Sequence, residues 1–144
     1  MSQDRIRCLL AMLGTDVHSK GIRTLAQLLR DQGVEVIYLG EHNTAEGLIN
    51  ALIAEDADVL GLSYSTATYV HYTRDLMQKM QAAGVSDVPV MLGGLIHADD
   101  EPALRDMGVQ GIFGPGSTLP DIVAFLQQAT GKSLSAPGSA PASA

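Results

Sequence analysis

The sequence predicts a single α/β domain whose five parallel strands form a doubly wound sheet with helices on both faces. Three observations support this prediction: short apolar runs, amphipathic segments between them, and a length suited to one core. The 144 residues are 46% hydrophobic and 17% charged. This is enough apolar material to bury a core, and it fits one domain rather than two.

Five apolar runs mark the expected strands. They lack the polar alternation of a half-exposed strand, which is typical of strands that are covered on both faces. They occupy residues 6–13, 34–39, 59–63, 88–92 and 111–113.

The intervening segments carry apolar residues at helical spacing, as in Ile22, Leu25 and Leu29. Polar residues stand where helix N-caps are expected, and glycines follow the expected helix ends: Thr44, Thr118, Gly33, Gly84 and Gly108. Right-handed crossovers then give a Rossmann-like parallel sheet. At this chain length the flavodoxin-like strand order 2-1-3-4-5 is favoured.

Composition separates this domain from the end of the chain. Residues 131–144 are rich in Ser, Ala, Pro and Gly and carry almost no apolar bulk. Such a segment cannot offset the entropy of ordering it. We therefore expect residues 1–130 to form the domain and residues 131–144 to be a flexible tail.

Charge and composition exclude several classes of function. Nine basic and sixteen acidic residues give a net charge of −7, which argues against binding to a nucleic-acid backbone. The single cysteine, Cys8, lies in an apolar run and is expected to be a small core residue. There is no basic leader before an apolar region and no run long enough for a membrane span, so a cytoplasmic protein without membrane contact is expected.

The chemistry is expected at the carboxyl ends of the strands, because doubly wound sheets bind ligands where their strand order reverses. The loop after the first strand carries Asp16, His18 and Gly21. A neutral imidazole can ligate a transition metal while a carboxylate holds its other ring nitrogen. Taken alone, these two residues are better explained by an ordinary Asp–His hydrogen bond in a surface loop.

Three further loops reach the same edge of the sheet. Hydroxyl groups follow the third strand, paired glycines end the fourth, and a glycine-rich turn opens the last helix. Each is a weak signal alone, but their shared edge strengthens the prediction of a binding site. The residues concerned are Ser63, Ser65, Gly93, Gly94, Gly114, Gly116 and Ser117.

Together, the motif Asp16-x-His18-x-x-Gly21, the loop with Ser63 and the pair Gly93-Gly94 resemble the cobalamin-binding domain of B12-dependent enzymes, over about residues 5–128. The resemblance implies that His18 is the lower ligand of the cobalamin cobalt and that Asp16 supports it. The cofactor's own dimethylbenzimidazole would then be displaced from cobalt.

The same resemblance assigns the remaining residues to the displaced nucleotide tail. Ser63 would hydrogen-bond the benzimidazole, with Ser65 in the same loop, and Gly93 and Gly94 would leave room for the tail. The turn containing Gly114, Gly116 and Ser117 would close around its nucleotide end.

Within this family, the F-G-P-G stretch at residues 113–116 is most similar to adenosylcobalamin-dependent acyl-CoA mutases of the methylmalonyl-CoA and isobutyryl-CoA type. The resemblance implies a small mutase subunit, inactive alone, whose large TIM-barrel partner binds the acyl-CoA. A corrinoid carrier of a methyltransferase system remains an alternative, as does a stand-alone B12 carrier or sensor. A response-regulator receiver is disfavoured because Ser63, not a phosphoacceptor Asp, follows the third strand, and a flavodoxin because the chain has no Trp for flavin stacking.

Overall fold

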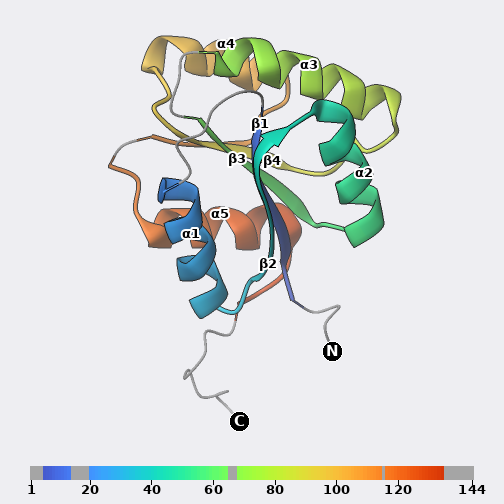
Figure 1. Cartoon of the computed structure of the whole chain (residues 1–144). Coiled ribbons are helices and arrows are strands. Elements are labelled where there is room, and N and C mark those ends of the chain that lie inside the picture. The colour runs from blue at the N-terminus through green and yellow to red at the C-terminus, as the bar shows by residue number, and fades with distance from the viewer. Residues whose placement is uncertain (1–4, 14–19, 65–67, 115, 135–144) are drawn as a thin grey trace.

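The computed structural model describes residues 5–13, 20–64, 68–114 and 116–134. Five strands and five α-helices alternate along the chain, with a short 3₁₀ helix, η2 (Ala98–Asp100), before α4 (Figure 1). The strands are β1 (Arg7–Leu13), β2 (Glu35–Asn43), β3 (Val59–Tyr64), β4 (Val90–Gly94) and β5 (Gly111–Phe113). The α-helices are α1 (Lys20–Asp31), α2 (Ala45–Glu55), α3 (Tyr69–Ala82), α4 (Glu101–Asp106) and α5 (Leu119–Thr130).

The strands form one parallel sheet in the order β2-β1-β3-β4-β5, which confirms the predicted fold and strand order. β2 differs from the expectation because it runs on to Asn43. Its pairing with β1 shifts register after Leu10 and again after Ala11, and Gly40 adopts a positive φ of 75° within it. An edge strand can absorb such irregularities because it has a neighbour on one side only.

Two hydrophobic cores flank the sheet, one on each face. Leu9, Leu60 and Leu92 face one core, against which α2, α3 and α4 pack. Leu10 and Met91 face the other core, which is covered by α1 and α5. Figure 1 shows the same separation of the helices into two layers. Because neighbouring strand residues point to opposite faces, each strand supplies both cores.

Helix ends follow the expected capping pattern. The Thr44 hydroxyl accepts a hydrogen bond from the Gly47 N–H (3.0 Å) at the start of α2. At the start of α5, Thr118 and Asp121 form a reciprocal capping box. The end of α2 was not foreseen, because a non-glycine residue, Asp56, takes the left-handed conformation there (φ 51°).

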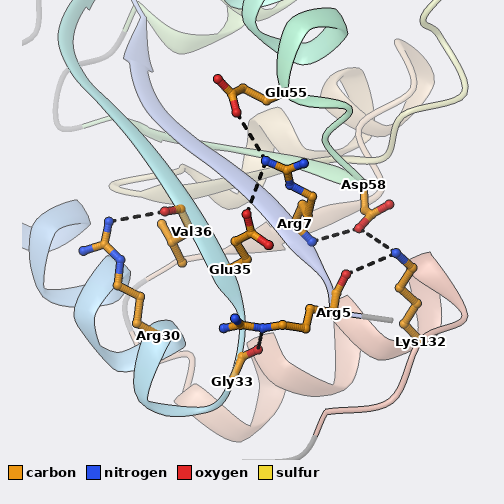
Figure 2. Close-up of polar contacts among 9 residues, drawn as sticks. All are labelled: Arg5, Arg7, Arg30, Gly33, Glu35, Val36, Glu55, Asp58 and Lys132. Carbon is orange, nitrogen blue, oxygen red and sulfur yellow. Dashed lines mark hydrogen bonds and ion pairs between the residues drawn. The ribbon is translucent and has the colours of Figure 1, made fainter. Parts of the chain in front are cut away.

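A polar network ties together the amino-terminal ends of the strands, at the edge opposite the predicted site (Figure 2). The Arg7 guanidinium lies 3.2 Å from carboxylate oxygens of Glu35 and of Glu55. The Asp58 carboxylate accepts the Arg7 backbone N–H (2.8 Å) and pairs with the Lys132 ammonium (3.0 Å). The segment after α5 is therefore held against the start of β1.

This contact bears on the predicted tail. Beyond Lys132, Leu134 packs against the core under α5 and its N–H donates to the Gln127 side chain (3.0 Å). The chain thus contacts the domain up to Leu134. Flexibility of residues 135–144 stays a prediction, since they lie outside the described residues.

Across the described parts of the chain, none of the helices has the length and apolar character that a membrane span requires.

Cys8 should be chemically inert in the folded protein. It is fully buried in β1, and burial raises the pKa of its thiol to about 12. The folded state holds the thiol proton more tightly than the unfolded chain does, in which the thiol has its ordinary pKa of 9.0. The protonated thiol therefore contributes its full stabilisation below pH 9.0, and this stabilisation is lost as the pH rises towards 12. At pH 8 we expect iodoacetamide to alkylate the native chain far more slowly than the urea-unfolded chain, as measured by mass spectrometry, because the buried thiol is both protonated and out of reach of the reagent. Equal rates would show that Cys8 is accessible.

Candidate cofactor-binding site

A cavity of about 400 Å³ opens at the carboxyl edge of the sheet, on the face covered by α1 and α5. This volume lies within the range of small-molecule sites, and it comes at the edge where doubly wound sheets bind ligands. Four strands, two helices and the turn before α5 contribute to its wall. The lining residues are Leu10, Gly21, Ile22, Leu25, Gly61, Leu62, Ser63, Met91, Leu92, Gly93, Gly94, Phe113, Gly114, Gly116, Ser117 and Ile122.

The cavity exists because the central strands lack bulky side chains on this face. Along β3, Leu60, Leu62 and Tyr64 face the opposite core, whereas Gly61 and Ser63 alternate with them. In β4, Gly93 takes the next position after Met91 on the cavity face, and it pairs with Ser63. Small residues at paired positions therefore leave a gap between the sheet and the two helices.

The inner end of the gap is apolar. A Cβ atom placed on Gly61 would lie 2.6 Å from a methyl carbon of Leu10 and 2.9 Å from the terminal methyl of Met91. These two side chains therefore cover the strand where Gly61 has none. Ile22 of α1 and Ile122 of α5 add apolar surface from the helix side.

The paired glycines of β4 have different roles. Gly94 has a φ of 108°, and a Cβ atom there would lie only 1.9 Å from the Tyr64 carbonyl oxygen. Only glycine fits this close approach of two backbones. A Cβ atom on Gly93 would meet the Phe113 carbonyl oxygen at an ordinary 3.5 Å, so Gly93 is not needed for packing. Its lack of a side chain keeps the cavity open.

The turn between β5 and α5 forms the outer wall. Ser117 donates its N–H to the Gly114 carbonyl (3.1 Å), which closes the turn. Gly116 has a φ of 93°, and a Cβ atom there would meet no atom within 4 Å. Ser63 and Ser117 place hydroxyl groups at a cavity that is otherwise apolar. Such a site can bury a flat heteroaromatic group and hydrogen-bond its few polar atoms.

The structure brings seven of the ten predicted site residues to this one cavity: Gly21, Ser63, Gly93, Gly94, Gly114, Gly116 and Ser117. The other three, Asp16, His18 and Ser65, lie outside the described residues. Sequence reasoning missed the apolar part of the wall. The period-two pattern of small residues at Gly61 and Ser63 was the signal that could have revealed it.

His97 is followed closely in the chain by two carboxylate residues, Asp99 and Asp100. His97 Nδ1 lies 3.8 Å from an Asp99 carboxylate oxygen, and both side chains are largely exposed. The Asp100 carboxylate instead accepts a hydrogen bond from Tyr69. Among the described residues, no group of three or more His, Cys, Asp or Glu side chains is placed to hold a metal ion.

Comparison with known proteins identifies the family to which this chain belongs. Residues 6–123 match the B12 binding domain family. The chain belongs to this family. It is 37% identical over 113 residues to the 2-hydroxyisobutanoyl-CoA mutase small subunit of Aquincola tertiaricarbonis, covering 78% of this chain and 83% of the relative. It is 38% identical over 118 residues to the pivalyl-CoA mutase small subunit of Xanthobacter autotrophicus, covering 82% and 79%.

A solved structure shares the fold of this B12-binding domain. The crystal structure of a cobalamin-binding protein from Desulfitobacterium hafniense DCB-2 matches with a TM-score of 0.70 at 21% identity. The match covers 87% of this chain and 59% of that chain. A Cβ atom at Gly21 or Gly116, two of the lining glycines, would meet no atom within 4 Å, so packing requires neither residue to be glycine.

The two glycines of β4 should respond differently to substitution. Gly93→Val places its side chain in the cavity, so cobalamin affinity should fall at least tenfold while the free energy of unfolding changes by less than about 1 kcal/mol. Gly94→Ala forces a backbone clash, so it should cost more than about 2 kcal/mol of stability. Urea unfolding and cobalamin titration of both variants measure this contrast. Unchanged cobalamin affinity in Gly93→Val would show that the cavity does not receive the cofactor.

Proposed function

We propose that this chain is the cobalamin-binding small subunit of an adenosylcobalamin-dependent acyl-CoA mutase, a radical isomerase that rearranges a carbon skeleton. Its similarity to two mutase small subunits over about four-fifths of their own length carries the proposal. Those relatives are subunits rather than complete enzymes. The chain is accordingly proposed to act in a complex and to be inactive alone.

The cavity is proposed to receive the nucleotide tail of the cofactor. Ser63 and Gly93 line the cavity at paired positions of β3 and β4, which supports roles in which Ser63 would hydrogen-bond the benzimidazole and Gly93 would leave space for the ring. The turn at Gly114, Gly116 and Ser117 would enclose the phosphate and ribose end, where backbone N–H groups and hydroxyls suit polar oxygens. Gly21, at the start of α1, would admit the tail between helix and sheet.

His18 and Asp16 are proposed to act together at the cobalt. His18 would be its lower ligand, with the cofactor's own base displaced into the cavity. Asp16 would bond the other imidazole nitrogen, which selects the tautomer and raises the basicity of the ligating nitrogen. When bound, adenosylcobalamin supplies the adenosyl radical that starts the rearrangement. The chain's own residues hold and orient the cofactor and keep its nucleotide out of water.

The partner is proposed to be a large TIM-barrel subunit that binds the acyl-CoA and covers the upper face of the corrin. Radical chemistry needs a site from which water is excluded, and the described cavity would enclose only the nucleotide side of the cofactor. The cytoplasmic location expected from the sequence remains a prediction.

Cobalamin should bind with His18 on cobalt. We expect the visible spectrum of the complex to show displaced benzimidazole, and the Co(II) form to show nitrogen hyperfine coupling that changes when histidine is ¹⁵N-labelled. Asp16→Ala should weaken binding or turnover by about 10- to 100-fold without unfolding the chain. His18→Ala is the matched control and should abolish the histidine signal. A complex that keeps its own benzimidazole on cobalt would contradict the assignment.

The isolated chain should be catalytically silent. With adenosylcobalamin and candidate acyl-CoAs, turnover should appear only when the large subunit is added, because the substrate site and the cover of the corrin belong to that partner. Gas chromatography of the isomeric acids measures the product. Turnover by this chain alone would refute the proposal that the large subunit supplies the substrate site and the cover of the corrin. Methyl transfer from a methylcobalamin-loaded chain to a thiol acceptor would instead favour a corrinoid carrier of a methyltransferase system.

A further inference from the structure

We infer that Tyr69 is a positioning residue for the cofactor site, acting through the loop that follows the paired glycines of β4. Tyr69 lies on the opposite face of the sheet from the cavity, so no contact with cofactor is involved. The inference rests on the proposed cobalamin-binding function.

The Tyr69 hydroxyl joins two parts of this loop. It accepts a hydrogen bond from the His97 backbone N–H (2.8 Å) and donates one to the Asp100 carboxylate (2.5 Å). The ring itself is 3% exposed and packs against Tyr64, with ring centroids 6.0 Å apart. We call the two hydrogen bonds of the hydroxyl the Tyr69 latch.

Burial raises the pKa of Tyr69, and its hydrogen bond to Asp100 raises the pKa further. The phenol therefore keeps its proton and remains the donor to the carboxylate. A short hydrogen bond to a charged acceptor is among the stronger kinds in proteins. The latch is thus suited to hold a loop in one conformation.

The latched loop has few other anchors. Leu95 and the side chain of His97 are 61% and 73% exposed, whereas Ile96 is buried. The Leu95 N–H donates to the Tyr64 carbonyl (3.0 Å), and the Ile96 N–H donates to the Gly94 carbonyl (3.0 Å). Main-chain bonds thus hold the beginning of the loop. At its end the Asp100 N–H donates to the His97 carbonyl (3.0 Å), and the latch ties this turn to α3.

The position of this loop shapes the mouth of the cavity. A Cβ atom placed on Gly114 would lie 3.8 Å from the Ile96 carbonyl oxygen and 3.9 Å from that of Gly94. The backbone after β4 therefore lies against the turn before α5. Gly94 and Gly114 both line the cavity, so the latched loop acts on the cavity through these two neighbours.

Tyr69→Phe tests the inference because it removes the hydroxyl and keeps the ring. Hydrogen–deuterium exchange of the cofactor-free chain should be faster for amides at residues 95–101, with His97 most affected. The dissociation constant for cobalamin, measured by fluorescence quenching or calorimetry, should rise about 3- to 10-fold. Asp100→Ala removes only the second bond of the latch and should shift both readouts in the same direction by a smaller amount.

Tyr64→Phe is the matched control. It also removes a buried tyrosine hydroxyl from the same core, one that hydrogen-bonds Thr73 of α3 (3.1 Å). It should leave the exchange of residues 95–101 and the cobalamin dissociation constant within twofold of wild type.

The outcomes separate this inference from the proposed function. If Tyr69→Phe binds cobalamin with the same affinity as the wild-type chain, the positioning role of Tyr69 is overturned and the proposed function is not. The same holds if Tyr64→Phe loses as much cobalamin affinity as Tyr69→Phe. Failure of the wild-type chain to bind cobalamin would overturn the proposed function, and the inference with it.

Discussion

The alternation of side chains across a parallel sheet is the constraint on which the rest of this structure depends. Each strand must send every second residue to each face. β3 meets this constraint unequally: Leu60, Leu62 and Tyr64 fill one core, while Gly61 and Ser63 leave the other face nearly bare. One strand thereby supports a packed core and a cavity at the same level of the sheet.

The two faces of the sheet differ in their packing: one carries a hydrophobic core, and the other carries a second core together with the cavity at its carboxyl edge. On the face under α2, α3 and α4, large side chains from successive strands, among them Leu9, Leu60 and Leu92, form one hydrophobic core. On the other face, α1 and α5 rest on Leu10 and Met91 near the middle of the sheet but are separated from it at the carboxyl edge. A core that is closed on one side can tolerate an opening on the other, because the free energy of folding comes mostly from buried apolar surface.

Polar groups are likewise separated along the strands. At the amino-terminal edge, the Asp58 carboxylate accepts the Arg7 backbone N–H and pairs with Lys132, which fixes the start of β1 and the segment after α5. Ion pairs that are partly exposed contribute little energy each, so their value here is mainly in fixing geometry. At the carboxyl edge, Ser63 and Ser117 present hydroxyl groups to the cavity. Placing the structural charges far from the cavity leaves its wall largely uncharged.

Much of this arrangement was determined by the sequence alone. Apolar runs and helical spacing predicted the five βα units and their order, because both patterns are local consequences of burial. Strand ends followed by glycine and hydroxyl residues predicted seven residues that do meet at one cavity. These residues meet because the carboxyl ends of parallel strands must share an edge, whatever the details of packing, whereas their role in binding a cofactor stays a prediction.

Tertiary structure decided what depends on distances between remote segments. The sequence could not distinguish Gly93 from Gly94, because the distinction lies in how closely Tyr64 approaches each of them. Nor could it show that Leu10 and Ile122, over a hundred positions apart, line the same cavity, since both look like ordinary core residues. The bond between Tyr69 and Asp100 was equally hidden, because it joins the start of one helix to a loop 31 residues later. The local pattern of apolar residues in the sequence indicates which face of a strand or helix a residue occupies. Contacts between segments remote in the sequence depend instead on how the helices pack against the sheet.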